Sequence, residues 1–354
     1  MPVNTSRTTY REHTDTENIL KLRQVLSTLP AFCKDYFRSI DSTTTTKTRI
    51  SYAYDIRIFF QFLLDENPAF KNYAMTDFSV AVLDQIKAVD LEEYMEYLKV
   101  YQNGDKTETN GERGLKRKIS ALRSFYAYYY KREMIHTKPT VLIDVPKIHD
   151  KSIIRLDTDE VALLLDYIEH CGDSLTGQKR VYYEKTKERD LAIVTLLLGT
   201  GIRVSECVGL DIEDVDFKNN GIKVTRKGGN EMVVYFGEEV EKALKRYLEI
   251  REGITPLAGH EHALFYSAQR KRMGVQAVEN MVKKYSRQIT TTKKITPHKL
   301  RSTYGTALYQ ETGDIYLVAD VLGHKDVNTT KKHYAALDDA RRRQAATAVR
   351  LRED

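Results

Sequence analysis

The sequence predicts a mainly α-helical protein with two domains and one small antiparallel β-sheet. Apolar residues recur at helical spacing in most segments of the chain. Only residues 221–226 (GIKVTR) and 232–236 (MVVYF) are typical of strands, and they flank the turn signal KGGN at 227–230. At 354 residues the chain is too long for one ordinary core, which favours two domains.

Composition is typical of a globular protein from a reducing compartment. Hydrophobic residues make up 41% of the sequence and charged residues 30%. Because Cys33, Cys171 and Cys207 have no CxxC spacing, neither a disulfide framework nor a zinc site is expected. No apolar run approaches the roughly 18 residues of a membrane span, and the polar N-terminus does not resemble a signal peptide. We therefore expect a cytoplasmic protein that does not enter a membrane.

The first half of the chain predicts a bundle of helices. Residues 1–15 are polar and expected to be mobile, and apolar residues follow at helical spacing over 19–29. The threonines at 43–46 offer N-caps for a longer helix. Asp90 and Glu93 match a capping box, which predicts that a further helix begins there.

A polar loop at residues 103–114 precedes a long basic helix predicted at residues 114–135. The helix combines an aromatic stripe with four cations that are candidates for contact with DNA: Lys116, Arg117, Lys118 and Arg123. Residues 113–151 contain ten Lys or Arg against three Asp or Glu, although the whole chain has a net charge of only +6. A local patch of this kind is typical of a surface that binds a polyanion, and an ordinary solvated helix face is the alternative interpretation.

The second half predicts a mainly helical domain after an extended linker at residues 141–155. A polar excursion at residues 171–188 precedes a buried helix at 189–201 that ends in glycines. The next helix carries Arg203 and Glu206, which share one face because they are three residues apart.

Residues 296–334 contain side chains suited to attack on a phosphodiester. The segment opens with Thr-Pro, a typical helix start, so His298 lies in a first turn where free N–H groups favour an anion. Arg301 shares that face one turn later, and His324 follows at a glycine turn. Tyr334 is the only tyrosine after His324.

Taken in order, these residues resemble the boxes of the tyrosine recombinase (phage integrase) family. The boxes are TGIRVSE with Arg203, the hairpin with Lys227, HKLRST with His298 and Arg301, LGH with His324, and the late Tyr334. The segments TRISYAYDIRIFFQFL and KRKISALRSFYAYYYKREMI also resemble the helical core-binding domain of that family. Two departures stand out: the spacing from His324 to Tyr334 is one residue longer than in many Xer-like members, and residues 171–188 form a longer segment.

The resemblance implies a mainly α fold in five parts. These are an N-terminal extension (1–28), a SAM-like helical core-binding domain (29–140), a linker (141–155), a catalytic domain with a small antiparallel sheet (156–338) and a C-terminal tail helix (339–354). It also implies double-stranded DNA with inverted-repeat sites as the partner, and a homotetramer on two sites with a dimer on each.

By resemblance, Tyr334 attacks a backbone phosphorus and forms a 3′-phosphotyrosyl intermediate, and strand exchange then passes through a Holliday junction. Covalent catalysis of this kind splits a difficult step in two. Arg203 and Arg301 are expected to neutralise the non-bridging oxygens in bidentate fashion, and His324 to add a hydrogen bond.

The remaining predicted roles concern protons and orientation. The resemblance implies that Lys227 is the general acid for the departing 5′ oxygen, and that His298 accepts or relays the tyrosine proton. Glu206 is expected to orient the site. A set of cations of this kind requires no metal ion and no cofactor.

Two alternatives to a site-specific recombinase remain at this point. A type IB topoisomerase uses a similar Arg, Lys, His and Tyr set to relax supercoiled DNA. A non-catalytic DNA-binding regulator would need no ordered tyrosine and arginine set, so the sequence favours it least.

Overall fold

The computed structural model describes residues 9–149, 153–226, 229–324 and 326–328. The chain forms two compact units that divide between Asp150 and Lys151. Among the described residues, no helix is long and apolar enough to cross a membrane.

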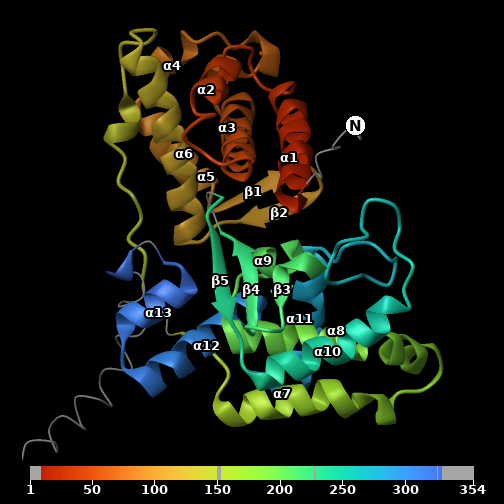
Figure 1. The fold of residues 1–354 in the computed structure, drawn as a ribbon. Helices are drawn as coiled ribbons and strands as arrows, with labels where there is room; N and C mark the ends of the chain where they lie inside the picture. The colour runs from red at the N-terminus through yellow and green to blue at the C-terminus, as the bar shows by residue number, and fades with distance from the viewer. Residues whose placement is uncertain (1–8, 150–152, 227–228, 325, 329–354) are drawn as a thin grey trace, which may run out of the picture. The chain divides into compact units, whose positions relative to one another are not determined.

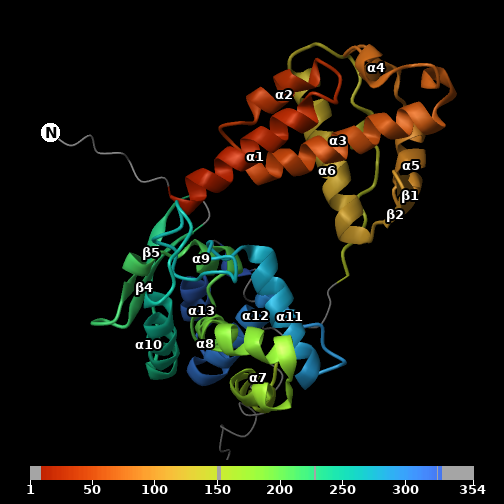
Figure 2. The same cartoon turned by 90° about the vertical axis from the view of Figure 1, so that its right-hand side faces the viewer.

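The first unit is a helical bundle with one short β-hairpin. Its helices are α1 (Tyr10–Leu26), α2 (Cys33–Ser39), α3 (Thr46–Glu66), α4 (Val82–Gln85), α5 (Ala88–Tyr97) and α6 (Glu112–Lys131). The unit also contains three 3-10 turns, η1 (Pro68–Phe70), η2 (Met75–Asp77) and η3 (Pro139–Val141), the last of which follows α6. Strands β1 (Val100–Asn103) and β2 (Lys106–Thr109) pair antiparallel. Helix α1 lies along α3, and α3 packs on α6 (Figures 1 and 2).

Aromatic side chains fill the core of the first unit. Phe59 and Phe60 of α3 and Phe125 of α6 are fully buried, and ring pairs such as Phe60–Phe125 meet edge to face. This geometry suits the quadrupoles of the rings. The hydroxyl of the buried Tyr129 donates to Phe32 O at 2.7 Å. The predicted aromatic stripe of the basic helix is therefore core.

The structure corrects three expectations for the first unit. Helix α1 begins at Tyr10, so the last part of the expected mobile tail is helical, with Thr9 as its N-cap. The expected loop at 103–114 contains most of the β1–β2 hairpin and the start of α6, because Gly104 takes a positive φ of 61° at the turn. Asp90 is the third residue of α5 rather than its N-cap, and its carboxylate accepts from the backbone N–H of Lys87 at 2.7 Å.

The second unit is mainly helical. Its helices are α7 (Thr158–His170), α8 (Gly177–Thr200), α9 (Val204–Gly209), α10 (Glu238–Glu252), α11 (Val275–Ile289), α12 (Pro297–Thr312) and α13 (Ile315–Leu322), with 3-10 turns η4 (Cys171–Ser174) and η5 (Ile212–Asp214). Strands β3 (Val215–Asp216), β4 (Gly221–Thr225) and β5 (Glu231–Tyr235) form one antiparallel sheet in that order. The sequence-based prediction of a mainly α fold with a small antiparallel sheet is confirmed.

Helix α8 is the central element of the second unit, because α7, α10 and α12 all pack against it (Figure 1). Its second half is buried almost continuously from Arg189 to Leu197. The expected polar excursion at 171–188 is mostly the first half of α8, since no Gly or Pro interrupts it after Gly177. The hydroxyl of Tyr183 connects the first half of α8 to the end of α7, because it donates a hydrogen bond to Glu169 O at 2.6 Å.

A buried carboxylate links α3 to α6 in the first unit. Asp55 is 3% exposed and receives the ammonium of Lys118, itself 5% exposed, at 3.3 Å. Arg117 pairs with the same carboxylate. Burial raises the pKa of Asp55, and the two cations oppose that shift.

We predict that Asp55→Ala destabilises the protein by about 3–5 kcal/mol, because it leaves the Lys118 ammonium buried without its anion. Urea unfolding of the full chain, followed by circular dichroism, measures the change. Glu66→Ala, at the exposed end of the same helix, is the control and should stay within about 0.5 kcal/mol of the parent. The double variant Asp55→Ala/Lys118→Met should recover part of the loss. An Asp55→Ala protein as stable as the control would contradict this role.

Candidate functional site

A left-handed glycine turns the chain at the end of α8 toward the candidate site. Gly201 has φ 62°, and a Cβ there would lie 2.3 Å from the ring of Tyr304 and 2.9 Å from Leu322. Only glycine fits this close approach of α8 to α12 and α13. The turn brings Arg203, two residues later, to the end of α13.

Arg203 is the N-cap of α9 and is held by Glu206. The buried Glu206 carboxylate accepts from the backbone N–H of Arg203 at 2.8 Å and from its guanidinium Nη1 at 2.7 Å. The Glu206 carboxylate therefore caps the start of the short helix α9 and also holds the Arg203 side chain. This contact agrees with an orienting role for Glu206.

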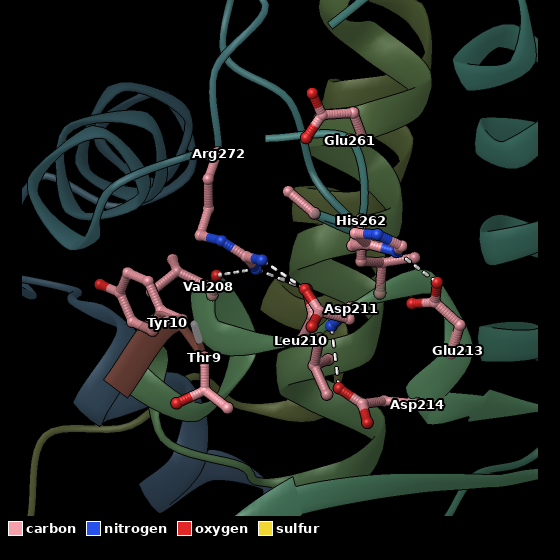
Figure 3. Close-up of polar contacts among 12 residues, drawn as sticks. Thr9, Tyr10, Val208, Leu210, Asp211, Glu213, Asp214, Glu261, His262 and Arg272 are labelled. Atoms are coloured by element: carbon pink, nitrogen blue, oxygen red, sulfur yellow. Dashed lines mark hydrogen bonds and ion pairs between the residues drawn. The ribbon is translucent and has the colours of Figure 1, made fainter. Parts of the chain in front are cut away.

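A second arginine secures the other end of α9 (Figure 3). Arg272 Nη1 donates to Val208 O at 3.1 Å and to Leu210 O at 2.8 Å, and its guanidinium pairs with the Asp211 carboxylate. The backbone N–H of Asp211 donates in turn to Asp214 at 2.9 Å. Because carbonyls at a helix C-terminus lack partners within the helix, an arginine there is stabilising. Helix α9 is thus fixed at both ends.

Helix α12 delivers His298 and Arg301. It begins with Thr296 as N-cap and Pro297 as first residue, as predicted, and His298 is exposed in the first turn. Arg301 is buried, at 5% exposure. Its Nη1 donates to Gly201 O at 2.6 Å, and its Nη2 donates to Leu322 O.

Helix α13 ends in a Schellman motif that positions His324. Gly323 is left-handed, with φ 62° and ψ 49°. The backbone N–H of His324 donates to Ala319 O at 2.9 Å, and that of Gly323 donates to Asp320 O at 2.8 Å. The glycine turn predicted before His324 is therefore present, and its hydrogen bonds fix the backbone of His324.

Three arginines converge on the last four carbonyls of this helix end. Arg203 Nη2 donates to Gly323 O at 3.3 Å, and Arg301 donates to Leu322 O. Arg226, from the end of β4, donates to Val321 O at 2.6 Å and to Asp320 O at 3.2 Å. The negative end of a helix dipole favours such cations. Against these three guanidiniums stand the buried carboxylate of Glu206 and the exposed carboxylate of Asp320, so positive charge is in excess, which suits a phosphodiester.

The structure brings together part of the predicted site. Arg203, Arg301 and the turn that carries His324 meet at the end of α13, and His298 lies in the first turn of α12. Lys227 and Tyr334 lie outside the described residues. Arg226 was not among the residues predicted from the sequence, although its position beside the hairpin lysine was a signal that this turn carries more than one cation.

The four candidate DNA contacts differ in their surroundings. Lys116 is exposed on α6, whereas Lys118 is buried and pairs with Asp55, which Arg117 also binds. Arg123 donates to Thr140 O at 3.1 Å and to Ile143 O at 2.5 Å. These internal contacts weigh against direct DNA contact by Lys118 and Arg123.

We predict that Gly323→Ala destabilises the protein by at least the roughly 1–2 kcal/mol that a left-handed residue costs. The added Cβ would also lie 1.7 Å from Arg226 Nη1, which displaces that guanidinium. Thermal and urea unfolding measure the change. Gly253→Ala is the matched control, because Gly253 has φ −78° and its Cβ would meet only Ile250 O at 3.5 Å. Equal losses in both variants would contradict the assigned role of Gly323.

Residues 155–341 match the phage integrase family. Tyrosine recombinase XerC of Caldanaerobacter subterraneus subsp. tengcongensis is 32% identical over 328 residues, which cover 90% of this chain and 86% of that protein. Tyrosine recombinase XerS of Lactococcus lactis subsp. cremoris is 31% identical over 340 residues, covering 89% of this chain and 93% of the relative.

Solved recombinase structures share the fold. XerH recombinase bound to palindromic difH substrate gives a TM-score of 0.65 at 19% identity, covering 98% of this chain and 91% of that one. The Tn1549 transposon integrase in complex with circular intermediate DNA gives 0.62 at 21% identity, covering 88% and 98%. The sequence matches establish the family, and these structures agree with its fold. The chain therefore belongs to the phage integrase family, as a site-specific tyrosine recombinase related to the Xer enzymes.

Proposed function

We propose that this recombinase cleaves and rejoins DNA through a 3′-phosphotyrosyl intermediate at the end of α13. The observation that carries the proposal is the convergence of Arg203 and Arg301 on one helix end, beside the turn of His324. A phosphodiester placed there would face two guanidiniums at once.

The arginines would supply most of the transition-state stabilisation. The five-coordinate phosphorane carries more negative charge than the phosphodiester, and a planar guanidinium matches two of its oxygens. By analogy with arginine fingers, one such group can contribute on the order of 10³–10⁵ in rate. Because Arg301 is buried and Arg203 is bound by Glu206, both are held before DNA arrives, which limits reorganisation during the reaction.

The covalent step exchanges one ester for another. The Tyr334 hydroxyl oxygen attacks the phosphorus, so a P–O bond to tyrosine forms while the P–O5′ bond breaks. His298 takes the tyrosine proton, and Lys227 gives a proton to the departing 5′ oxygen. The 5′ hydroxyl of another strand then attacks the phosphotyrosine in the reverse sense. The energy of the first bond is kept in the protein–DNA link, so no nucleotide cofactor is required.

The partner that fits this chemistry is double-stranded DNA with inverted-repeat sites. XerH was solved on a palindromic substrate, and lambda integrase as a dimer on a core site. We propose the same arrangement here, with a dimer on each site, a tetramer across two sites and a Holliday junction between the two exchanges. The helical first unit would serve as the core-binding domain. The tail helix expected at residues 339–354 lies outside the described residues.

We predict that Tyr334→Phe abolishes the covalent protein–DNA adduct, because phenylalanine has no oxygen to attack the phosphorus. A duplex selected for binding from a random-sequence pool is incubated with the full chain and analysed on denaturing gels. Tyr316→Phe is the matched control, since Tyr316 is 71% exposed on α13, and it should keep the adduct. An adduct that persists in Tyr334→Phe would overturn the nucleophile. Relaxation of any supercoiled plasmid, without dependence on a site, would instead favour a type IB topoisomerase.

We predict that Lys116→Ala weakens DNA binding about equally for all sequences, because its exposed ammonium would contact phosphate. The slope of log affinity against log salt should fall by about 1 in magnitude. Titrations from 50 to 200 mM salt measure both effects, with Lys242→Ala on α10 as the control. Lys242 is exposed and pairs with Glu238, so its removal should leave the slope unchanged. An unchanged slope in Lys116→Ala would remove this residue from the interface.

A further inference from the structure

Arg226 joins the β4–β5 hairpin to the end of α13. Its backbone closes the hairpin turn, since Arg226 N donates to Asn230 O at 2.8 Å and Gly229 N donates to Arg226 O at 3.0 Å. Its side chain reaches away from the turn and donates to Val321 O and Asp320 O. One residue therefore fixes both the turn and the distance of the hairpin from the helix end.

The guanidinium fits closely against the helix end. A Cβ on Gly323 would lie 1.7 Å from Nη1 and 2.3 Å from Cζ of Arg226, so the side chain occupies space that only glycine leaves open. The Nε atom of Arg226 is buried without a hydrogen-bond partner among the described residues. Burial lowers the pKa of Arg226; Glu206 opposes this shift and Arg203 adds to it. The guanidinium is thus held partly desolvated at this point, and the carboxylates of Glu206 and Asp320 offset its repulsion from Arg203.

These contacts of Arg226 bear on Lys227, which is the next residue along the chain. A lysine side chain loses about 2 kcal/mol of rotamer entropy when it is ordered. A general acid must nevertheless reach one leaving oxygen, and a displacement of about 1 Å can cost on the order of 10²-fold in rate. The contacts of Arg226 fix the residue that immediately precedes the lysine.

We propose that Arg226 is a positioning residue, which sets the reach of Lys227 toward the leaving 5′ oxygen by fastening the hairpin to the helix end that carries His324. The inference rests on the proposed function, in which Lys227 is the general acid. Arg226 itself neither transfers a proton nor needs to touch the phosphate. The competing role for Arg226 is that of a third guanidinium that binds the phosphate directly. A comparison of two leaving groups distinguishes this role from the positioning role.

The test compares two leaving groups in single-turnover cleavage by the full chain. One duplex has the ordinary 5′ oxygen at the scissile phosphate, and the other has a bridging sulfur there. An alkoxide leaves poorly without a proton, since an alcohol is about as weak an acid as water, whereas a thiol is a far stronger acid and needs no general acid to leave. Sulfur therefore rescues a defect in proton donation but not a defect in phosphate clamping.

We expect Lys227→Ala to lose about 10²–10⁴-fold with the oxygen substrate and to recover most of this with sulfur. Arg226→Ala should lose about 10–10²-fold with oxygen and recover likewise, while Arg226→Lys should lose less because it keeps a donor to the carbonyls. Arg203→Lys should remain slow with both substrates. Arg287→Ala, an exposed arginine on α11, is the matched control and should cleave like the parent protein.

The sulfur-to-oxygen rate ratio is measured within one preparation, so any inactive fraction of a variant cancels. If Lys227→Ala is not rescued, the general-acid assignment fails. If Lys227→Ala is rescued and Arg226→Ala is slow with both substrates, Arg226 is a phosphate clamp and the inference is overturned. A parental oxygen rate in Arg226→Ala overturns it as well.

Discussion

The buried guanidinium of Arg301 joins two turns that are far apart in the chain, because it donates to Gly201 O and to Leu322 O at once. A buried cation without such partners would cost several kcal/mol, so the folded unit must bring both carbonyls to it. Gly201 permits the close approach on one side, and the end of α13 presents its unpaired carbonyls on the other. The site therefore forms only when α8, α12 and α13 pack together.

The choice of helix carbonyls as partners has an electrostatic consequence. Three guanidiniums repel one another, and the negative end of the α13 dipole offsets part of that repulsion in the absence of DNA. Carbonyl oxygens carry partial charge only, so the excess positive charge of the cluster remains available to a phosphate. A second carboxylate in place of these carbonyls would hold the arginines as firmly but would cancel the attraction for DNA.

Local sequence signals predicted those parts of the site that depend on neighbouring residues. Thr296 and Pro297 predicted the start of α12, and the glycine before His324 predicted the turn that ends α13, because caps are set by a few adjacent residues. The resemblance to recombinases supplied the order of the boxes, which no local pattern contains. Tyr334 stays a prediction, since it lies outside the described residues.

Charge patterning was less informative, because the same residue types serve the core and the surface. Lys118 belongs to a basic stretch but turns inward to the buried Asp55, and only the packing of α3 on α6 decides its direction. Arg226 is the opposite case: its contacts connect residues about a hundred positions apart, at Asp320 and Val321, so no spacing rule could indicate them. The predictable features are those fixed within one helical turn. The contacts of arginines that join separate turns depend on the tertiary fold, so they can be identified only from the structure.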